Sequence, residues 1–334
     1  MPYEPKFTIT SRLLRITEEI GAYREKILAA TVQVSWIPVL QREARVRNTH
    51  SSTAIEGNPL TLAQVRALDE GRELPAVQDR SRREVLNYFA GLRHIERQQA
   101  KKTITRADIL RLHAIISTGA MDQGRAGRFR SMRVRVGDFF PPPPERVPGM
   151  MRELLGWWNS PSRQWPAVLS SAIIHYRFEE IHPFADGNGR TGRTLALWEL
   201  YRRGFDTHHN FSVDEFYWEN RPRYYEALDE VRRQAGNLTE WLEYSAEAIH
   251  VTLGRVWGRV QQLSAATGSR RLVLRPKQEQ LLQMLRDRRA LTPREIWGGI
   301  GISRQGAMDL IRPLLDAGLV RRVGTKKSGK YVLA

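Results

Sequence analysis

The sequence predicts a mainly α-helical protein, a helical bundle with one short β-hairpin, followed by a small basic C-terminal domain. Three observations support this fold class. Long segments repeat apolar residues at helical spacing. One stretch, RFRSMRVRVGDF, alternates with a period of two instead. The last fifth of the chain carries a charge balance different from the rest, which indicates a separate module.

Composition limits the class of protein. The 334 residues suffice for two or three domains, and 41% hydrophobic content with nine Trp can build their cores. No apolar run reaches the roughly 20 residues of a membrane helix, and the start MPYEPKFTIT does not resemble a signal peptide. We therefore expect a cytoplasmic protein with no membrane partner. The absence of cysteine excludes disulfides, thiolate zinc sites and thiol nucleophiles, so catalysis would use His, carboxylates, bound metal or backbone dipoles.

Turn and capping residues delimit the first helices. The stretch after Pro38 is expected to be helical until Gly57, Asn58 and Pro59 stop it. TRADILRLHAIIST opens with Thr105 as N-cap and an acid three residues later. Between residues 127 and 148, valines and a methionine alternate with arginines before four consecutive prolines, which predicts a short hairpin.

Two longer helical segments follow the hairpin. VLSSAIIHYRFEEI reads as a largely buried helix, and NLTEWLEYSAEAIHVTLGRVWGRVQQL keeps apolar spacing to about Leu263. ATGSRR, small and polar, is the best linker, and there is no internal repeat. The expected domains are an N-terminal helical region, a helical core, a linker and a C-terminal domain, at residues 1–110, 111–265, 266–271 and 272–334.

The segment IHPFADGNGRTGR joins two of these helices and concentrates polar chemistry. Gly187 and Gly189 let the backbone turn tightly and approach a ligand. The free N–H groups of the helix that begins near Asn188 or Gly189 then point into the loop, which suits an anion such as phosphate. The segment is neither a P-loop nor a dinucleotide-binding turn, because GxxxxGK[ST] is absent and a helix, not a strand, precedes it.

Each side chain in this segment has a chemical role to offer. Asp186 can hold Mg²⁺ together with substrate phosphates, and Asn188 can donate to a phosphate oxygen. Arg190 and Arg193 lie on one helix face and can neutralise outer phosphates. His182 can accept a proton from an attacking hydroxyl. The alternative is that the His and Asp cap helix ends and the glycines merely make a turn, which is less consistent with all seven residues at this spacing.

HPFADGNGRTGR resembles the HPFx[D/E]GNGRxxR motif of Fic domains at every defined position, and HYRFEEI resembles the preceding helix of that family. The resemblance implies a mainly helical fold and transfer of AMP from ATP to a protein hydroxyl, called AMPylation. It makes His182 the general base, Asp186 the Mg²⁺ ligand, Gly187 to Gly189 the anion hole, and Arg190 and Arg193 the phosphate ligands. Val136, Gly137, Thr191 and Gly192 complete that part of the expected ATP site.

Further segments extend the resemblance to roughly residues 1–265. The hairpin lies where Fic proteins carry a flap that binds the target as an added strand. ENRPRYYEAL resembles the helix at the adenine pocket, with Asn220 and Tyr225 as contacts, although both residues also suit ordinary helix surface and core. SSTAIEGN resembles the inhibitory motif [S/T]xxxE[G/N], read as Ser52, Glu56 and Gly57. Glu56 would then hold Arg193 and keep ATP unproductive, whereas outside this family it would be an exposed Glu at a helix end.

The C-terminal module holds most of the excess charge. Residues 270–334 carry 15 Lys and Arg against 5 Asp and Glu, a net charge of +10 out of +17. Three helices and a hairpin are expected there, which resembles a winged helix-turn-helix domain. Arg304 and Gln305 would begin the recognition helix, with Lys326, Lys327 and Lys330 on the wing near DNA phosphates. A winged helix used for protein contacts is the alternative.

Two classes of function remain open from the sequence. The first is an auto-inhibited adenylyltransferase that uses ATP and Mg²⁺, modifies a target protein or itself, and is located by its basic tail. The second is a DNA-binding regulator whose Fic domain senses nucleotide; the presence of His182 and Asp186 favours the enzyme. Removal of AMP from a modified protein is a further alternative, in which Glu56 activates water. Homodimerisation is also expected from the resemblance.

Overall fold

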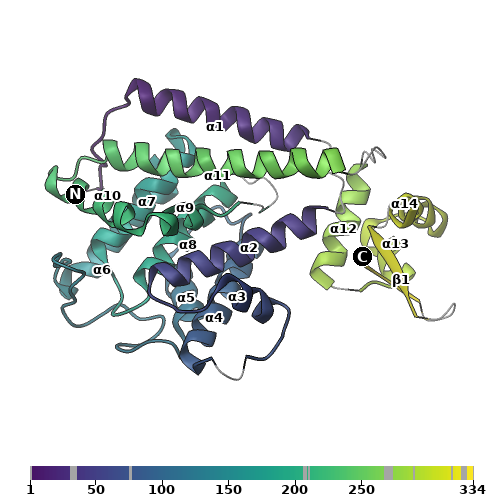
Figure 1. Ribbon diagram of the computed structural model, residues 1–334, viewed down its shortest axis with the longest axis horizontal. Helices are drawn as coiled ribbons and strands as arrows, with labels where there is room; N and C mark the ends of the chain where they lie inside the picture. Colours follow the sequence, from purple (N-terminus) through teal and green to yellow (C-terminus); the bar gives the residue numbers. More distant parts are fainter. Residues whose placement is uncertain are drawn as a thin grey trace. The chain divides into compact units, whose positions relative to one another are not determined.

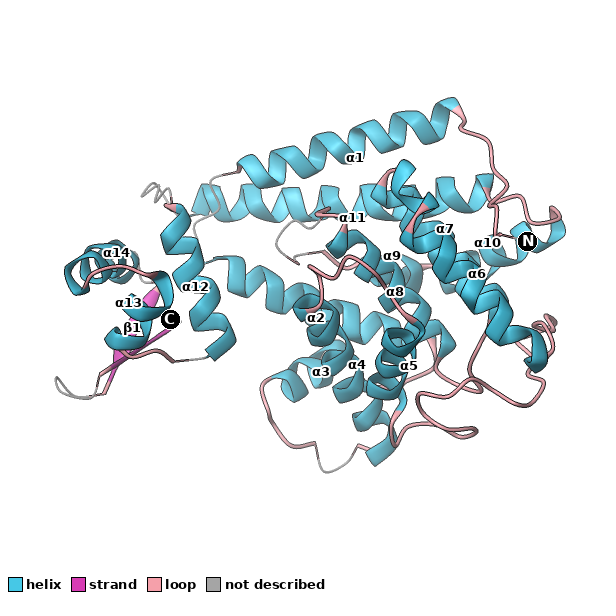
Figure 2. Cartoon of the chain, turned by 180° about the vertical axis from the view of Figure 1, so that it is seen from behind, coloured by secondary structure: helices cyan, strands magenta, loops and turns pink. Residues whose placement is uncertain are grey.

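The computed structural model is predominantly helical (Figures 1 and 2). It describes residues 2–30, 36–74, 77–205, 209, 211–266, 274–288, 290–316, 319–324 and 329–333. The chain divides into two compact units, one formed by residues 1–27 with 42–257 and the other by residues 28–41 with 258–334. The expected linker at 266–271 lies outside the described residues apart from Ala266, which ends a helix.

Among the residues described before position 118 there are five helices, and their ends follow the expected signals. The helix after Pro38 runs as predicted to Ile55, and Gly57 then adopts a φ of +92°, which favours glycine. Thr105 caps the next predicted helix, with a reciprocal capping box to Asp108. The helices are α1 (Ser11–Ala29), α2 (Trp36–Ile55), α3 (Leu62–Asp69), α4 (Asp79–Arg97) and α5 (Arg106–Ser117).

The middle of the chain builds the core of the first unit. Helices α7 (Ala167–Ile181) and α8 (Asn188–Arg202) are buried along most of their length and pack against each other. Trp158, Trp198 and Trp241 are among the largest fully buried side chains. The other elements here are η1 (Pro144–Arg146), α6 (Val147–Asn159), η2 (Pro161–Gln164), α9 (Val213–Glu219), α10 (Arg221–Arg233) and α11 (Thr239–Ala266).

The predicted hairpin between residues 127 and 148 is much shorter than its alternating pattern suggests. Only Val136 and Phe139 pair, through two backbone hydrogen bonds of 2.9 Å, and Gly137 takes a φ of +56° in the turn between them. Pro141 to Pro144 have no N–H to donate, so the ladder cannot continue on that side. The segment is therefore a tight turn with one bridge rather than a two-stranded ribbon.

The second unit ends in a small helical and strand module. It contains α12 (Pro276–Arg288), α13 (Pro293–Ile300), α14 (Arg304–Asp316), β1 (Val320–Val323) and β2 (Lys330–Leu333). The strands are antiparallel, and Leu291 bridges to Tyr331 on β2. The expected turn at Gly298–Gly301 begins later, because Gly298 and Gly299 are helical and only Gly301 has a positive φ.

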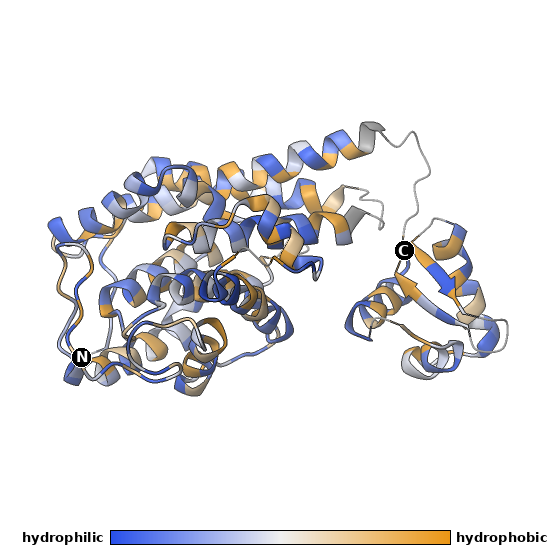
Figure 3. Ribbon diagram, turned by 60° about the horizontal axis from the view of Figure 1, so that its bottom comes forward, coloured by the Kyte–Doolittle hydropathy of each residue, from blue (hydrophilic) through white to orange (hydrophobic). Residues whose placement is uncertain are grey.

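The distribution of apolar and polar residues agrees with this helical packing. Figure 3 shows both apolar and polar residues on the helices, as amphipathic helices require. In the C-terminal module the apolar side chains form one core, which includes Leu285, Ile296, Ile311 and Tyr331. None of the helices among the described residues has an apolar stretch long enough to cross a bilayer.

Candidate active site

The loop between α7 and α8 is fixed by its own side chains. His182 ends α7 in the left-handed region (φ 48°), and its backbone N–H donates to the Phe178 carbonyl at 2.9 Å. Asn188 accepts from the Phe184 N–H and donates to the Phe184 carbonyl, each at 2.9 Å. This buried amide closes the loop, so the structure uses Asn188 for loop geometry, a role that the sequence reading did not include.

A histidine from α5 braces the same loop. His113 Nδ1 accepts from the Gly127 N–H at 2.9 Å, which leaves Nε2 to donate to the Asp186 carbonyl at 2.9 Å. Its ring stacks on Phe184 with centroids 3.6 Å apart, and burial lowers its pKa to about 4. The sequence reading missed His113, because a lone histidine on an apolar helix face carries no specific signal.

Gly187 is required at this place by both conformation and space. Its φ is +75°, and a Cβ would lie 2.5 Å from Ser117 Oγ. The helix α8 therefore begins directly against α5, and the N–H groups of its first turn face the loop. Thr191 closes this turn from inside, because its hydroxyl donates to the Gly187 carbonyl at 2.8 Å.

Asp186 and Arg190 lie together beside the loop. Asp186 accepts backbone N–H bonds from Gly187 (2.5 Å) and Asp122 (3.3 Å), and one of its oxygens is 3.7 Å from Arg190 Nη2. Arg190 is buried, and its Nη1 lies 3.6 Å from Glu84. Its Nε and Nη1 have no hydrogen-bond partner within the described part of the chain. A buried guanidinium with free donors fits an anionic ligand at this position.

Arg193 is held by the end of α2. Its Nε donates to Ser52 Oγ at 2.9 Å, and its Nη2 donates both to the Ser52 carbonyl at 2.8 Å and to Glu56 Oε1 at 2.9 Å. Burial opposes the ionisation of Glu56, but the charges of Arg193 and Arg190 outweigh it and lower its pKa. Gly57 follows outside the helix with its φ of +92°. The structure thus places Glu56 against Arg193, as the resemblance implied, and adds Ser52 as a second partner of the same guanidinium.

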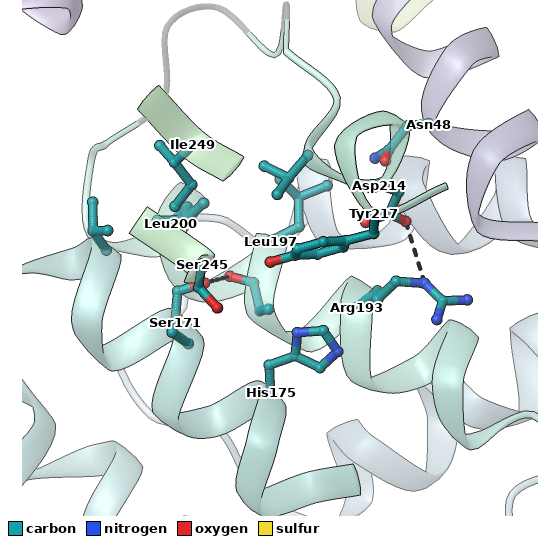
Figure 4. Close-up of a pocket in the computed structure, with 14 residues that line it drawn as sticks. Asn48, Ser171, His175, Arg193, Leu197, Leu200, Asp214, Tyr217, Ser245 and Ile249 are labelled. Atoms are coloured by element: carbon teal, nitrogen blue, oxygen red, sulfur yellow. Dashed lines mark hydrogen bonds and ion pairs between the residues drawn. The ribbon is translucent and has the colours of Figure 1, made fainter. Parts of the chain in front are cut away.

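Behind Arg193 lies a small cavity of about 30 Å³ (Figure 4). Asp214 on α9 is 3.6 Å from Arg193 Nε and accepts a 2.9 Å hydrogen bond from Tyr88. Tyr217 and His175 also point into this space (Figure 4). Arg193 is therefore held between two carboxylates, of which Glu56 also lines a second, larger cleft.

A cleft of about 790 Å³ opens in front of Arg193. Seven of the predicted site residues line it: Glu56, Val136, Gly137, His182, Gly189, Arg193 and Tyr225. Asn220 is elsewhere, as the N-cap of α10 on a separate hollow. Asp186, Gly187, Asn188, Arg190, Thr191 and Gly192 do not line the cleft but lie on the loop and helix that border it. Tyr225 also contacts the end of α2, since its hydroxyl donates to the Ile55 carbonyl at 3.4 Å.

His182 lines this cleft, and its ring is neutral at neutral pH. Burial lowers its pKa to about 4, while the backbone carbonyl of Glu179 accepts from the ring and opposes that shift. Its backbone is anchored by Arg130, whose Nε donates to the His182 carbonyl at 2.8 Å. Arg130 also donates to the carbonyls of Met132 and Pro142, so it ties the turn segment to the loop. The sequence did not predict this role for Arg130, because it is one of many arginines in that stretch.

The C-terminal site residues can be placed only in part. Arg304 and Gln305 are exposed at the start of α14, after Ser303, whose hydroxyl accepts from the Gly306 N–H at 3.1 Å. Lys330 is exposed at the start of β2, while Lys326 and Lys327 lie outside the described residues.

Comparison with known proteins agrees with this geometry. Residues 103–200 match the family model described as Fic/DOC family. Protein adenylyltransferase fic-1 of Caenorhabditis elegans is 32% identical over 230 residues, which cover 67% of this chain and 44% of the relative. Protein adenylyltransferase Fic of Nematostella vectensis is 32% identical over 245 residues, covering 71% and 54%. The chain thus spans only about half the length of these curated relatives.

Solved structures share the fold. A Fic family protein from Desulfovibrio desulfuricans G20 aligns over 99% of this chain and 98% of its own, with a TM-score of 0.69 and 26% identity. Fic-1 (residues 134–508) from C. elegans aligns over 75% of this chain and 73% of its own, with a TM-score of 0.66 and 27% identity. The motif, the loop geometry and these similarities agree, and the chain therefore carries a Fic/DOC family domain.

Proposed function

We propose that this protein is an adenylyltransferase that transfers AMP from ATP to a hydroxyl group of a target protein or of itself, and that Glu56 restrains it. The observation that most supports this proposal is the ion pair between Arg193 and Glu56, which lies in the same cleft as the neutral His182. The cleft would thus combine a base, an arginine that can bind a phosphate, and a carboxylate that already pairs with this arginine. The similar adenylyltransferases of Caenorhabditis and Nematostella support the activity.

In this mechanism the chain positions the reactants and moves one proton. The target oxygen attacks the α-phosphorus, the bond from that phosphorus to the bridging oxygen breaks, and pyrophosphate leaves. His182 accepts the hydroxyl proton through the ring nitrogen opposite the one that donates to the Glu179 carbonyl. The first-turn N–H groups of α8 receive the negative charge of the α-phosphate, while Arg190 and Arg193 receive that of the outer phosphates.

Mg²⁺ fits Asp186 by donor chemistry. Its carboxylate is 27% exposed beside the loop, and a single carboxylate with substrate phosphates is the usual protein share of a magnesium site. Among the described residues no three His, Asp or Glu side chains gather into a metal cluster. When bound, the ion would neutralise phosphate charge, and Asp186 would hold it next to Arg190.

The target would bind along the flap at residues 131–139. Among the described residues this segment has one backbone bridge, between Val136 and Phe139, and arginine side chains donate to the carbonyls of Met132 and Gly137. The remaining backbone groups can accept an added strand. Met132 and Phe140 are 42% and 69% exposed, and Arg135 places its guanidinium 5.6 Å from the Phe140 ring centroid. Such a surface would hold an extended target segment through its backbone and one or two apolar side chains.

The C-terminal module is proposed to bind DNA and so to locate the enzyme. Its helices α13 and α14 with the β1–β2 hairpin have the order of a winged helix-turn-helix, and Arg304 and Gln305 are exposed at the start of α14. Lys330, and by sequence Lys326 and Lys327, would face phosphates from the wing. We assign this role to residues 272–334, apart from the catalytic region at 1–265.

Mass spectrometry of the full chain, with ATP and Mg²⁺ and with Glu56→Gly as the released form, tests the proposal. A mass increase of one adenylyl group on the protein or on a lysate target supports transfer. Loss of AMP from a modified protein, dependent on Glu56, would favour hydrolytic removal of AMP, in which the Glu56 carboxylate activates water beside His182. ATP binding with neither change would favour a nucleotide sensor.

A further inference from the structure

Glu179 is a buried carboxyl group next to the proposed base, and the mechanism above gives its side chain no role. It lies on α7 one turn before His182, and only 8% of its side chain is exposed. Its Oε2 is 3.6 Å from His182 Nδ1. Its Oε1 is buried without a hydrogen-bond partner in the described part of the chain. A buried carboxyl group with an unsatisfied oxygen is costly, which indicates a use beyond packing.

The neighbouring helix is shaped to admit this carboxyl group. A Cβ on Gly192 of α8 would collide with Glu179 Oε1 and lie 3.1 Å from the Phe178 ring. The carboxyl group is therefore seated against the bare Cα of Gly192, with little freedom to turn. This contact gives Gly192 a steric role that its place in the helix interior does not explain.

Charged groups from three elements face Glu179. Arg193 on α8 and Arg232 on α10 favour its ionisation, while Glu56 after α2 opposes it; the Tyr224 hydroxyl on α10 also lies within its field. Burial is the largest influence and, together with Glu56, raises the pKa of Glu179 to about 8. With Glu56 in place, Glu179 therefore holds a proton at neutral pH.

We propose that Glu179 is a positioning residue for His182, and that its carboxylate, once Glu56 has withdrawn, stabilises the ring that His182 forms on accepting the target's hydroxyl proton. Withdrawal of Glu56 would then act twice. It frees Arg193 for phosphate, and it removes the negative charge that, after burial, contributes to the raised pKa of Glu179. The inhibitory carboxylate thus controls both the nucleotide pose and the strength of the base.

The proton balance is simple. The hydroxyl O–H bond breaks as the oxygen attacks phosphorus, and the proton moves to His182, which becomes positively charged. We infer that Glu179 loses its proton to solvent when Glu56 withdraws, and that it then stays ionised, as the carboxylate partner of a catalytic histidine does in other enzymes. Oε2 is on the Nδ1 side of the ring, so it does not compete for the nitrogen that accepts the proton.

This role of Glu179 rests on the proposed transferase activity. The experiments below distinguish a failure of the Glu179 role from a failure of the transferase activity. In the Glu56→Gly background, the rate of AMP incorporation is measured from about pH 3 to pH 9 for Glu179→Gln, because the pKa of His182 is about 4. The matched control is Glu180→Gln, whose carboxylate pairs with Arg177 away from the cleft. For Glu179→Gln we expect roughly tenfold slower transfer near neutral pH and an acidic limb about one pH unit lower. Glu180→Gln should stay within about twofold of its parent.

A second measurement needs no transfer. Histidine-labelled protein is titrated by NMR, with His182 assigned from the resonance lost in His182→Gln. Glu179→Gln should lower the pKa of His182, while Glu179→Asp, which keeps the charge on a shorter arm, should lower it less. An equal rate loss at every pH with an unchanged His182 pKa would overturn the inference and leave a packing role.

If Glu56→Gly transfers no AMP while the NMR shift occurs, the proposed function fails and the link between Glu179 and His182 stands. If Glu179→Gln does not fold, Glu179→Asp serves as the test. An unshifted pKa of His182 in that variant, together with full activity at all pH values, would overturn the inference.

Discussion

Arg193 Nη2 donates to Glu56 Oε1 at 2.9 Å, although the two residues are 137 positions apart in the chain. The pair is partly open to the cleft, because 32% of the Glu56 side chain is exposed whereas the Arg193 side chain is buried. The arginine is fixed and the glutamate is the partner that can leave.

Replacement of Glu56 by Gly is expected to increase self-modification with labelled ATP. A charge-assisted bond of this kind contributes about 1.5 to 3 kcal/mol, or roughly tenfold to hundredfold in productive ATP poses. Glu56→Gln should give a smaller gain, because it keeps the side chain's volume without its charge. The double substitution with Arg193→Ala should lose the gain, as both act on one phosphate. Unchanged incorporation in Glu56→Gly, with loss of AMP removal, would make Glu56 a hydrolytic residue.

Replacement of His182 by Ala is expected to abolish transfer while ATP binding survives. A base acts on the attacking hydroxyl and not on the nucleotide, so calorimetry should give ATP affinity within about threefold of the parent. His250→Ala, which removes a histidine paired with Glu19 outside the cleft, is the control and should retain activity. Parallel losses of affinity and rate in His182→Ala would contradict the role of base.

Replacement of Asp186 by Ala is expected to remove the Mg²⁺ dependence together with the activity. The carboxylate is the only acid in the loop, and neutralisation of phosphate charge would be lost with it. Transfer is measured against Mg²⁺ concentration. Asp122→Asn provides a neighbouring control, because Asp122 contacts Asp186 through its backbone N–H rather than its carboxylate. An unchanged Mg²⁺ titration in Asp186→Ala would exclude this residue as the ligand.

His175 is expected to make the fold sensitive to acid. Burial lowers its pKa to about 3, against 6.5 for an unperturbed histidine, so the folded state binds fewer protons between these values. Its stabilising contribution is present above pH 6.5 and declines as the pH falls toward 3. Relative to His175→Phe, the wild type should lose about 1 kcal/mol of unfolding free energy between pH 6.5 and 5.5. If the difference in unfolding free energy between the wild type and His175→Phe were the same at both pH values, this prediction would be refuted.

Arg304→Ala is expected to weaken DNA binding and its salt dependence, because a cation at the start of α14 would meet the DNA. The slope of log affinity against log salt should fall by about one if Arg304 contacts a phosphate, and specificity should relax if it contacts a base. Arg15→Ala removes an exposed charge from α1 and should leave binding unchanged. Deletion of the residues after about 266 should abolish binding but keep transfer. Equal affinity of the truncated protein would reject the assignment.

The sequence alone determined the helical fold and the loop, whereas the pairing of Glu56 with Arg193 was expected from the resemblance to Fic domains. Helix periodicity, caps and glycine positions act over a few residues, so they can be read locally, and HPFADGNGRTGR is specific enough to indicate its family and chemistry. The length of the hairpin was not predictable in this way. Alternation shows which residues can form a strand, but a ladder also needs a partner with free N–H groups, which Pro141 to Pro144 lack.

Only the tertiary structure decided which side chains serve the loop and which face the cleft. Asn188 reads as a ligand in sequence, yet its amide closes the loop on Phe184. His113 and Arg130 are far from the motif in the chain, and their contacts arise from the packing of α5 and the flap against it. Glu179 gains its importance from burial against Gly192 and from the charge of Glu56, which depend on distance in space and on loss of water. Neither quantity is contained in the order of the residues.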